Sequence, residues 1–135
     1  MAESRSHYPK ATPPNLPVLI EAKGVYILWN PQYAKLPKAV KYSLGLKIEN
    51  LFIDAIEAIS IAAFLPRSEK LPSLKRAVAR VDTLKVFLQL LWEMKHIDTK
   101  HYGEISEKLA SVGKMLGGWY GQVIKQNSPA GTGEK

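Results

Sequence analysis

The chain has 135 residues, of which 46% are hydrophobic, with no cysteine and a formal net charge of +7. This length gives one domain with enough apolar side chains for a core. The absence of cysteine excludes disulfides, thiolate metal sites and cysteine nucleophiles. No apolar run approaches the roughly 18 to 20 residues that cross a bilayer, and the N-terminus has no apolar segment of the secretory kind. We therefore expect a cytoplasmic protein without membrane contacts, whose charge attracts polyanions.

The N-terminal region combines several prolines with few apolar residues, which predicts a disordered arm over residues 1–15. Asn15 is a candidate N-cap for a first helix over about residues 16–33. Pro17 would then occupy the first turn, where its missing N–H does no harm. Pro31 is expected to bend or end this helix.

Apolar residues recur at intervals of three and four from Leu44 onwards, which predicts a second helix over about residues 40–64. The segment contains several isoleucines, but its spacing and its length of roughly 25 residues argue against strands. Pro66 is expected to end the helix. Three acidic residues lie off the apolar stripe and should face solvent: Glu49, Asp54 and Glu57.

The third and fourth helices are predicted over about residues 74–95 and 100–125, followed by a flexible tail over 127–135. Ser73 is a candidate N-cap for the third helix, and Asp98 or Thr99 for the fourth. In the fourth helix the apolar gaps alternate between four and three, as in helices packed lengthwise on one another. Because the connections are short, consecutive helices should be antiparallel. The pattern predicts an all-α, up-down-up-down antiparallel four-helix bundle over residues 16–126.

Glycines interrupt the second half of the fourth helix at four positions, although each costs up to about 1 kcal/mol relative to alanine in a helix. One interpretation is that they let a neighbouring helix come close, or mark fraying near the C-terminus. The other is that they form part of a contact between subunits, together with aromatic residues that one bundle core would not readily enclose. The four glycines are Gly113, Gly117, Gly118 and Gly121, and the candidate subunit-interface residues are Trp29, Tyr33, Trp92, Leu116, Gly117, Gly118, Trp119 and Tyr120.

Residues suited to catalysis or metal binding form no convincing pattern. Ser106, His101 and Asp98 could be imagined as a catalytic triad, but turn and capping roles explain them better. The sequence has no phosphate-binding glycine loop after a strand and no Glu-x-x-His motif of the di-iron bundles. We expect no enzyme activity, no metal and no cofactor, and a small enzyme or metal-binding bundle is the alternative from a different functional class.

Basic residues concentrate from Arg67 to Lys85, where six stand against two acidic residues, whereas residues 43–66 have one against three. A basic run can be an ordinary solvated helix face. Combined with the total charge, it favours a surface that contacts phosphates with little sequence preference and strong salt dependence. The candidate nucleic-acid-binding residues from this run are Arg67, Lys70, Lys75, Arg76, Arg80 and Lys85.

Several short motifs occur in a characteristic order from Leu16 to Ile124. They are Leu36-Pro37-Lys38, Tyr42-Ser43-Leu44-Gly45, Leu84-Lys85 with Leu88, Thr99 with Tyr102, and Val112-Gly113-Lys114-Met115-Leu116-Gly117-Gly118-Trp119. In this order the chain resembles a family of small four-helix-bundle proteins. That family includes the accessory variability determinant (Avd) proteins of diversity-generating retroelements and the proteins encoded in intervening sequences of bacterial 23S ribosomal RNA genes.

The resemblance implies a homopentamer, with bundles arranged as a barrel around a pore. It also implies a non-catalytic accessory protein that binds a reverse transcriptase and nucleic acid, as template RNA or DNA, during mutagenic retrohoming. Lys114 stands where related sequences carry a basic residue, which implies a nucleic-acid or subunit contact, whereas Gln89 replaces an arginine often found one turn after Lys85. The alternative is a protein of the ribosomal intervening-sequence type, with a structural or ribosome-associated role and no polymerase partner. The high basicity favours the retroelement type.

Overall fold

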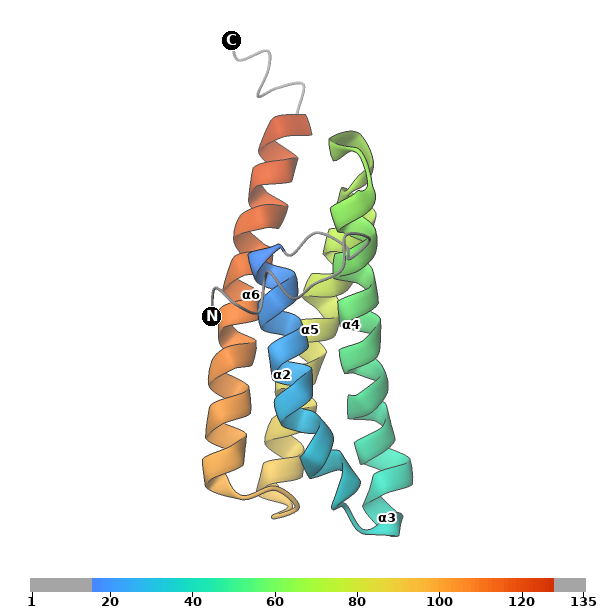
Figure 1. The fold of residues 1–135 in the computed structure, drawn as a ribbon, viewed down its shortest axis with the longest axis vertical. Helices are drawn as coiled ribbons and strands as arrows, with labels where there is room; N and C mark the ends of the chain where they lie inside the picture. The colour runs from blue at the N-terminus through green and yellow to red at the C-terminus, as the bar shows by residue number, and fades with distance from the viewer. Residues whose placement is uncertain (1–15, 128–135) are drawn as a thin grey trace, which may run out of the picture.

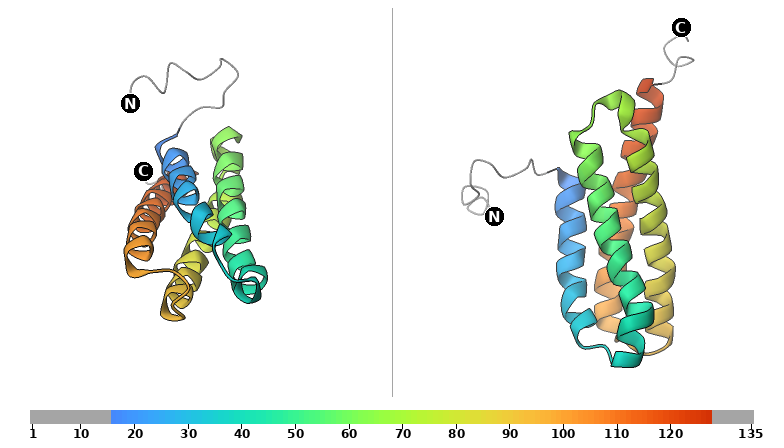
Figure 2. Two further views of the ribbon diagram at one scale, coloured as in Figure 1. Left: turned by 60° about the horizontal axis from the view of Figure 1, so that its bottom comes forward. Right: turned by 90° about the vertical axis from the view of Figure 1, so that its right-hand side faces the viewer.

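The computed structural model describes residues 16–127, and in this part of the chain all regular structure is helical. Four long helices pack against one another, and consecutive ones run in opposite directions (Figures 1 and 2). The predicted four-helix bundle is therefore confirmed. The predicted arm, the candidate cap Asn15 and the tail beyond Asn127 lie outside the described residues. The long helices are α2 (Pro17–Ala34), α4 (Leu46–Phe64), α5 (Leu71–Glu93) and α6 (Thr99–Asn127).

Three short elements lie in the connections between the long helices. The connection from α2 to α4 contains α3 (Lys38–Val40) and a π-helical turn, η1 (Lys41–Gly45). The connection from α4 to α5 contains a 3-10 turn, η2 (Arg67–Glu69). Each long helix contacts two neighbours, so that α2 and α5 occupy opposite corners of the bundle and α4 and α6 lie between them.

The first helix ends at Ala34, close to the predicted residue 33, although Pro31 lies inside it. The regular α4 begins at Leu46 rather than near residue 40, because the π-helical turn η1 precedes it. The third helix begins at Leu71 rather than near residue 74, and Ser73 is not its cap. Pro72 explains this difference, because its missing N–H falls in the first turn, where helical N–H groups have no partner in any case.

The start of α6 agrees with the prediction. The carboxylate of Asp98 accepts a hydrogen bond of 2.8 Å from the backbone N–H of His101, which is the bond expected of an N-cap. Before it, Lys95 adopts a left-handed conformation with φ of 66°, and the N–H of His96 bonds to the carbonyl of Leu91. These bonds end α5 and reverse the chain within a few residues.

The core consists of apolar side chains from all four long helices, and its largest fully buried residue is Trp29 of α2. The indole ring of Trp29 stacks on Phe52 of α4, with ring centres 5.8 Å apart. Glu49, which was expected to face solvent, accepts hydrogen bonds from the indole N–H of Trp29 at 3.0 Å and from the hydroxyl of Tyr26 at 2.6 Å. This carboxylate therefore ties α4 to α2.

The helices differ in length, and this shapes one end of the bundle. With a rise of 1.5 Å per residue, the 18 residues of α2 span about 27 Å and the 29 residues of α6 about 43 Å. Figure 1 shows that α2 begins well below the upper ends of α4 and α6. Among the described residues, the upper end therefore contains three helices rather than four. We call it the η2 end, because it includes that turn.

Candidate nucleic-acid interface

Two of the seven candidate nucleic-acid-binding residues, Arg76 and Arg80 of α5, are already paired. Both donate hydrogen bonds to the carboxylate of Asp54 on α4, and Arg76 also lies 3.3 Å from Glu57. The acidic residues predicted to lie on a separate exposed side of the second helix thus meet the basic run directly. This pairing joins α4 to α5 and offsets much of the positive charge expected there.

The pKa of Asp54 reflects its environment. Partial burial by itself raises the pKa of this carboxyl group, but hydrogen bonds from Arg80 and Arg76 outweigh that effect and leave the pKa below its ordinary value. Asp54 therefore stays ionised between the two guanidinium groups. Arg76 and Arg80 remain partly exposed, but any phosphate would compete with a carboxylate for them.

Lys85 folds across the bundle surface rather than projecting freely. Its ammonium nitrogen lies 3.8 Å from Asp82, and a Cβ atom at Gly113 would come within 2.9 Å of it. Gly113 thus leaves room for a lysine side chain, which agrees with the interpretation that a glycine permits close approach. For Gly117, Gly118 and Gly121 that interpretation is wrong, because no other side chain or helix of the described chain comes within 4 Å of the Cβ position.

The remaining four candidates gather near the η2 end. Arg67 belongs to η2, and its carbonyl accepts a hydrogen bond from Asn127 at the end of α6. Lys70 and Lys114 line one open cleft of about 520 Å³. Within residues 16–127, none of the four lies within 4.0 Å of a carboxylate. We call this set the η2-end cations: Arg67, Lys70, Lys75 and Lys114.

A second group of lysines lies at the opposite end of the bundle and was not singled out from the sequence. The α2–α4 and α5–α6 connections meet at this end, which is the lower one in Figure 1. The basic run drew attention to the α4–α5 connection only, since these lysines come from two segments about 60 residues apart. We call them the turn-end cations: Lys35, Lys38, Lys41, Lys95 and Lys100.

The candidate subunit-interface residues divide into buried and accessible ones. Trp29 and Leu116 have 0% of their surface exposed within the single chain, so the prediction that they contact another subunit is wrong. Both point into the apolar interior because they lie on the inner stripes of α2 and α6. The other six retain accessible surface: Tyr33, Trp92 and Tyr120 are half-buried, as is Trp119, and Gly117 and Gly118 are exposed.

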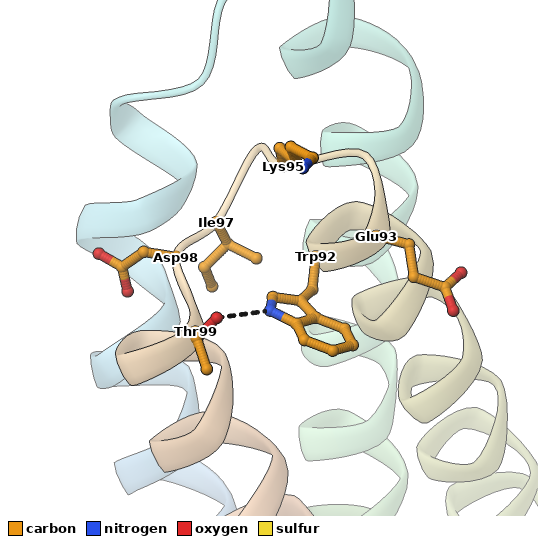
Figure 3. A pocket seen from close by; sticks show the side chains of 6 residues that line it. All are labelled: Trp92, Glu93, Lys95, Ile97, Asp98 and Thr99. Carbon is orange, nitrogen blue, oxygen red and sulfur yellow. Dashed lines mark hydrogen bonds between the residues drawn. The ribbon is translucent and has the colours of Figure 1, made fainter.

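The connection from α5 to α6 borders a hollow of about 590 Å³. Figure 3 shows the side chains that line it. The indole N–H of Trp92 donates a hydrogen bond of 3.1 Å to the hydroxyl of Thr99, and its ring stacks on Tyr102 at 4.8 Å. These contacts hold the last turn of α5 against the first turn of α6. Trp92 therefore has a partner within its own chain.

The three residues of the conceivable catalytic triad make local contacts in the first turns of α6 instead. The backbone N–H of His101, followed by its ring nitrogen, bonds to Asp98 and holds the pKa of that carboxyl group below its ordinary value. Ser106 donates to the carbonyl of Gly103 one turn earlier, at 3.3 Å. Ser106 thus makes a helical backbone contact and no nucleophile–base pair.

The outward surface of α2 has no role among the candidate sites named above. Ile20 and Ile27 lie two turns apart on this surface and are 50% and 68% exposed. Gly24 and Pro31 fall on the same side by helical spacing, and the exposed Lys23 and Asn30 border it. The sequence indicates this surface, because apolar residues surround most of the helix, and such helices are usually covered on several sides.

No family model matches the chain, and no curated protein is significantly similar to it in sequence. Residues 16–127 contain no group of three or more side chains placed to hold a metal ion. Over the same residues, no helix is both long enough and apolar enough to cross a membrane. The functional interpretation therefore depends on the placement of charge and apolar surface on the bundle.

Proposed function

We propose that this chain is a non-catalytic accessory protein of a diversity-generating retroelement, which binds nucleic acid, as template RNA or DNA, and the reverse transcriptase. The proposal is supported by the sequence resemblance, by the net charge of +7 and by the bundle fold. The observation that carries it is the set of η2-end cations, which meet no carboxylate within residues 16–127.

Unpaired cations suit a phosphate backbone for a physical reason. Each phosphate that a lysine or arginine neutralises releases condensed counterions, so binding weakens steeply as salt rises. Paired arginines contribute less, since a phosphate must displace the carboxylate first. We therefore assign the main contact to Arg67, Lys70, Lys75 and Lys114, with a lesser part for Lys85 and for the Arg76–Arg80 pair.

The outward surface of α2 supports the proposal that the protein is a homo-oligomer, with five subunits by resemblance. Ile20 and Ile27 expose a continuous apolar stripe, and covering it with another subunit would remove that surface from water. Ile27→Glu should then lower the sedimentation coefficient, while Lys108→Glu, at an exposed position on α6, serves as a control away from this surface. An unchanged coefficient for Ile27→Glu would exclude this surface as the interface.

Nucleic-acid binding can be tested with a labelled single-stranded RNA and a labelled DNA duplex of equal length. Affinity should fall by at least tenfold as salt rises from about 50 to 200 mM, given roughly three to four phosphate contacts. At a fixed salt concentration, the double variant Arg67→Glu/Lys75→Glu should bind both probes more weakly than the unchanged protein does. These positions are exposed, and neither side chain takes part in an ion pair or hydrogen bond within residues 16–127, so the fold should be preserved.

The matched control is Lys38→Glu/Lys100→Glu, which changes the charge equally at the opposite end. Equal losses in both double variants would show that only the total charge matters, and a salt-independent affinity would exclude phosphate contacts altogether. The reverse-transcriptase part has a separate test. A reverse-transcriptase gene should lie near the gene for this chain, and the two proteins should copurify, whereas a ribosomal RNA locus would indicate the intervening-sequence type.

A further inference from the structure

The cleft at the η2 end results from the unequal helix lengths. Above Leu16, the described chain has no fourth helix to cover the last two turns of α6. A cleft of about 520 Å³ lies at this end, and it is lined by the start of α2, the end of α4, Lys70 just before α5, and α6. Its size falls within the usual range of ligand sites, about 300 to 1,000 Å³.

On the wall of the cleft that belongs to α6, polar and apolar side chains are arranged along the helix axis. Lys114, Gly118 and Gln122 recur every four residues and so lie in one line along the helix. At Gly118, a Cβ atom would meet nothing within 4 Å, so the middle of this line is open. Beside it lie the half-buried ring of Trp119 and the side chain of Met115. The wall thus offers an apolar slot with a cation at one end and an amide at the other.

The position of Lys70 is determined by two contacts. Its ammonium donates a hydrogen bond of 2.6 Å to the carbonyl of Ala62, one of the last carbonyls of α4 that lack a partner inside the helix. The same ammonium lies 5.6 Å from the centre of the Trp119 ring. An ammonium has three donors, so two remain for a ligand. Lys70 is therefore held at the edge of the cleft with donating capacity left over.

We infer that this cleft binds one nucleotide of a single-stranded nucleic acid, with its base against Trp119 and its phosphate at Lys70 and Lys114. This inference rests on the proposed function and adds a specific site to it. Charge complementarity favours a nucleotide over a second copy of this basic chain, because among the described residues two lysines and no carboxylate line the cleft. A base has a flat face that stacks on an aromatic ring whatever its identity, which suits binding without sequence preference.

Filling the slot tests the inference without removing any charge. Gly118→Leu places a side chain in the middle of the slot, and Gly121→Leu places the same side chain on an exposed part of α6 that does not line the cleft. Within residues 16–127 both positions are open, and both changes replace glycine by a better helix former. The two variants should therefore be at least as helical as the unchanged protein, which circular dichroism can verify.

The measurement compares three labelled probes at about 100 mM salt: a 12-nucleotide oligothymidylate, an abasic strand with the same number of phosphates, and a duplex. The unchanged protein should bind oligothymidylate roughly five- to a hundredfold more tightly than the abasic strand, as expected for stacking of one base. Gly118→Leu should reduce oligothymidylate affinity to the abasic level and leave the duplex unaffected. Gly121→Leu should change neither affinity.

The outcomes separate this inference from the proposed function. If the unchanged protein binds all three probes equally with steep salt dependence, the phosphate contacts remain and the slot is excluded. The same conclusion follows if Gly118→Leu binds oligothymidylate as tightly as the unchanged protein does. If no probe binds, both the proposed nucleic-acid binding and the slot are excluded.

Discussion

Replacing Trp29 tests whether the central aromatic residue belongs to the core of one chain or to a contact between chains. Trp29 has no exposed surface, and its ring lies against both Phe52 and Tyr33 at centre distances of 5.8 Å. Its N–H also bonds to Glu49, which receives a second bond from Tyr26. A single side chain therefore holds α2 against α4 by both packing and a charged hydrogen bond.

The size of the effect follows from what is removed. Trp29→Ala deletes a fully buried ring system, and such changes lower the free energy of unfolding by about 3 to 5 kcal/mol. That is a large fraction of the roughly 5 to 15 kcal/mol typical of a domain. Trp29→Phe retains one aromatic ring but loses the bond to Glu49, so we expect a smaller loss of about 1 to 3 kcal/mol.

Urea unfolding followed by circular dichroism measures both losses. If Trp29 is a core residue, the difference between variant and unchanged protein is the same at protein concentrations of about 2 and 50 μM, because no subunit contact is involved. Ile27→Ala, on the outward surface of the same helix, is the matched control and should change intrachain stability little. The assignment to the core is refuted if Trp29→Ala costs less than about 1 kcal/mol, or if its cost appears only at the higher concentration.

Three further changes test other contacts. Gly45→Ala should destabilise the bundle by about 1 to 2 kcal/mol in thermal unfolding, because its Cβ would lie 2.7 Å from a methyl group of Leu36; an unchanged melting temperature would contradict this packing. The pKa of Asp54 is depressed in the folded protein. Its contribution to stability is therefore present above the ordinary pKa of 3.8 and is lost as pH falls through the folded-state pKa. Asp54→Asn should lose less stability than the unchanged protein when both are acidified. The pKa of Tyr26 is raised by its bond to Glu49 and by burial. The contribution of Tyr26 to stability is therefore present below the ordinary pKa of 10.0 and is lost as pH rises through the folded-state pKa. In Tyr26→Phe, the free energy of unfolding should fall less with rising pH in the alkaline range than in the unchanged protein.

The number and approximate position of the helices could be predicted because apolar spacing reports helical periodicity directly. Intervals of three and four residues placed all four long helices, and the carboxylate of Asp98 marked the start of α6. The start of α5 was predicted three residues too late. Ser73 has the side chain of a good cap, but Pro72 fits the first helical turn, and that preference prevailed.

Contacts between helices could not be predicted, because periodicity determines which face of a helix is inward but not its height relative to a neighbour. Asp54 and Arg76 are 22 residues apart, and their meeting depends on the axial alignment of α4 and α5. A shift of one turn, about 5.4 Å, would separate them. For the same reason, Glu49 was assigned to solvent although it accepts two hydrogen bonds from α2.

The candidate interface shows why the charge of a segment is a poor measure of its capacity to bind phosphate. Arg76 and Arg80 made the basic run conspicuous, yet both guanidinium groups are matched by Asp54 from a segment counted as acidic. Lys114 stands alone in its part of the sequence, and the fold brings it to the same cleft as Lys70. What matters for a polyanion is unpaired charge close together in space, and the pairing of helices decides that.

The open end of the bundle, by contrast, was implicit in the predicted helix lengths. A first helix over about residues 16–33 cannot cover a fourth helix over about 100–125, since the difference of roughly eight residues corresponds to about 12 Å of helix. With short connections at the opposite end, the excess must project at the end where α6 finishes. The segment that projects contains Gly117, Gly118 and Trp119, so glycines that no neighbouring helix within residues 16–127 approaches lie at the η2 end. Unequal helix lengths thus explain both the position of the cleft and why an aromatic side chain stays accessible within it.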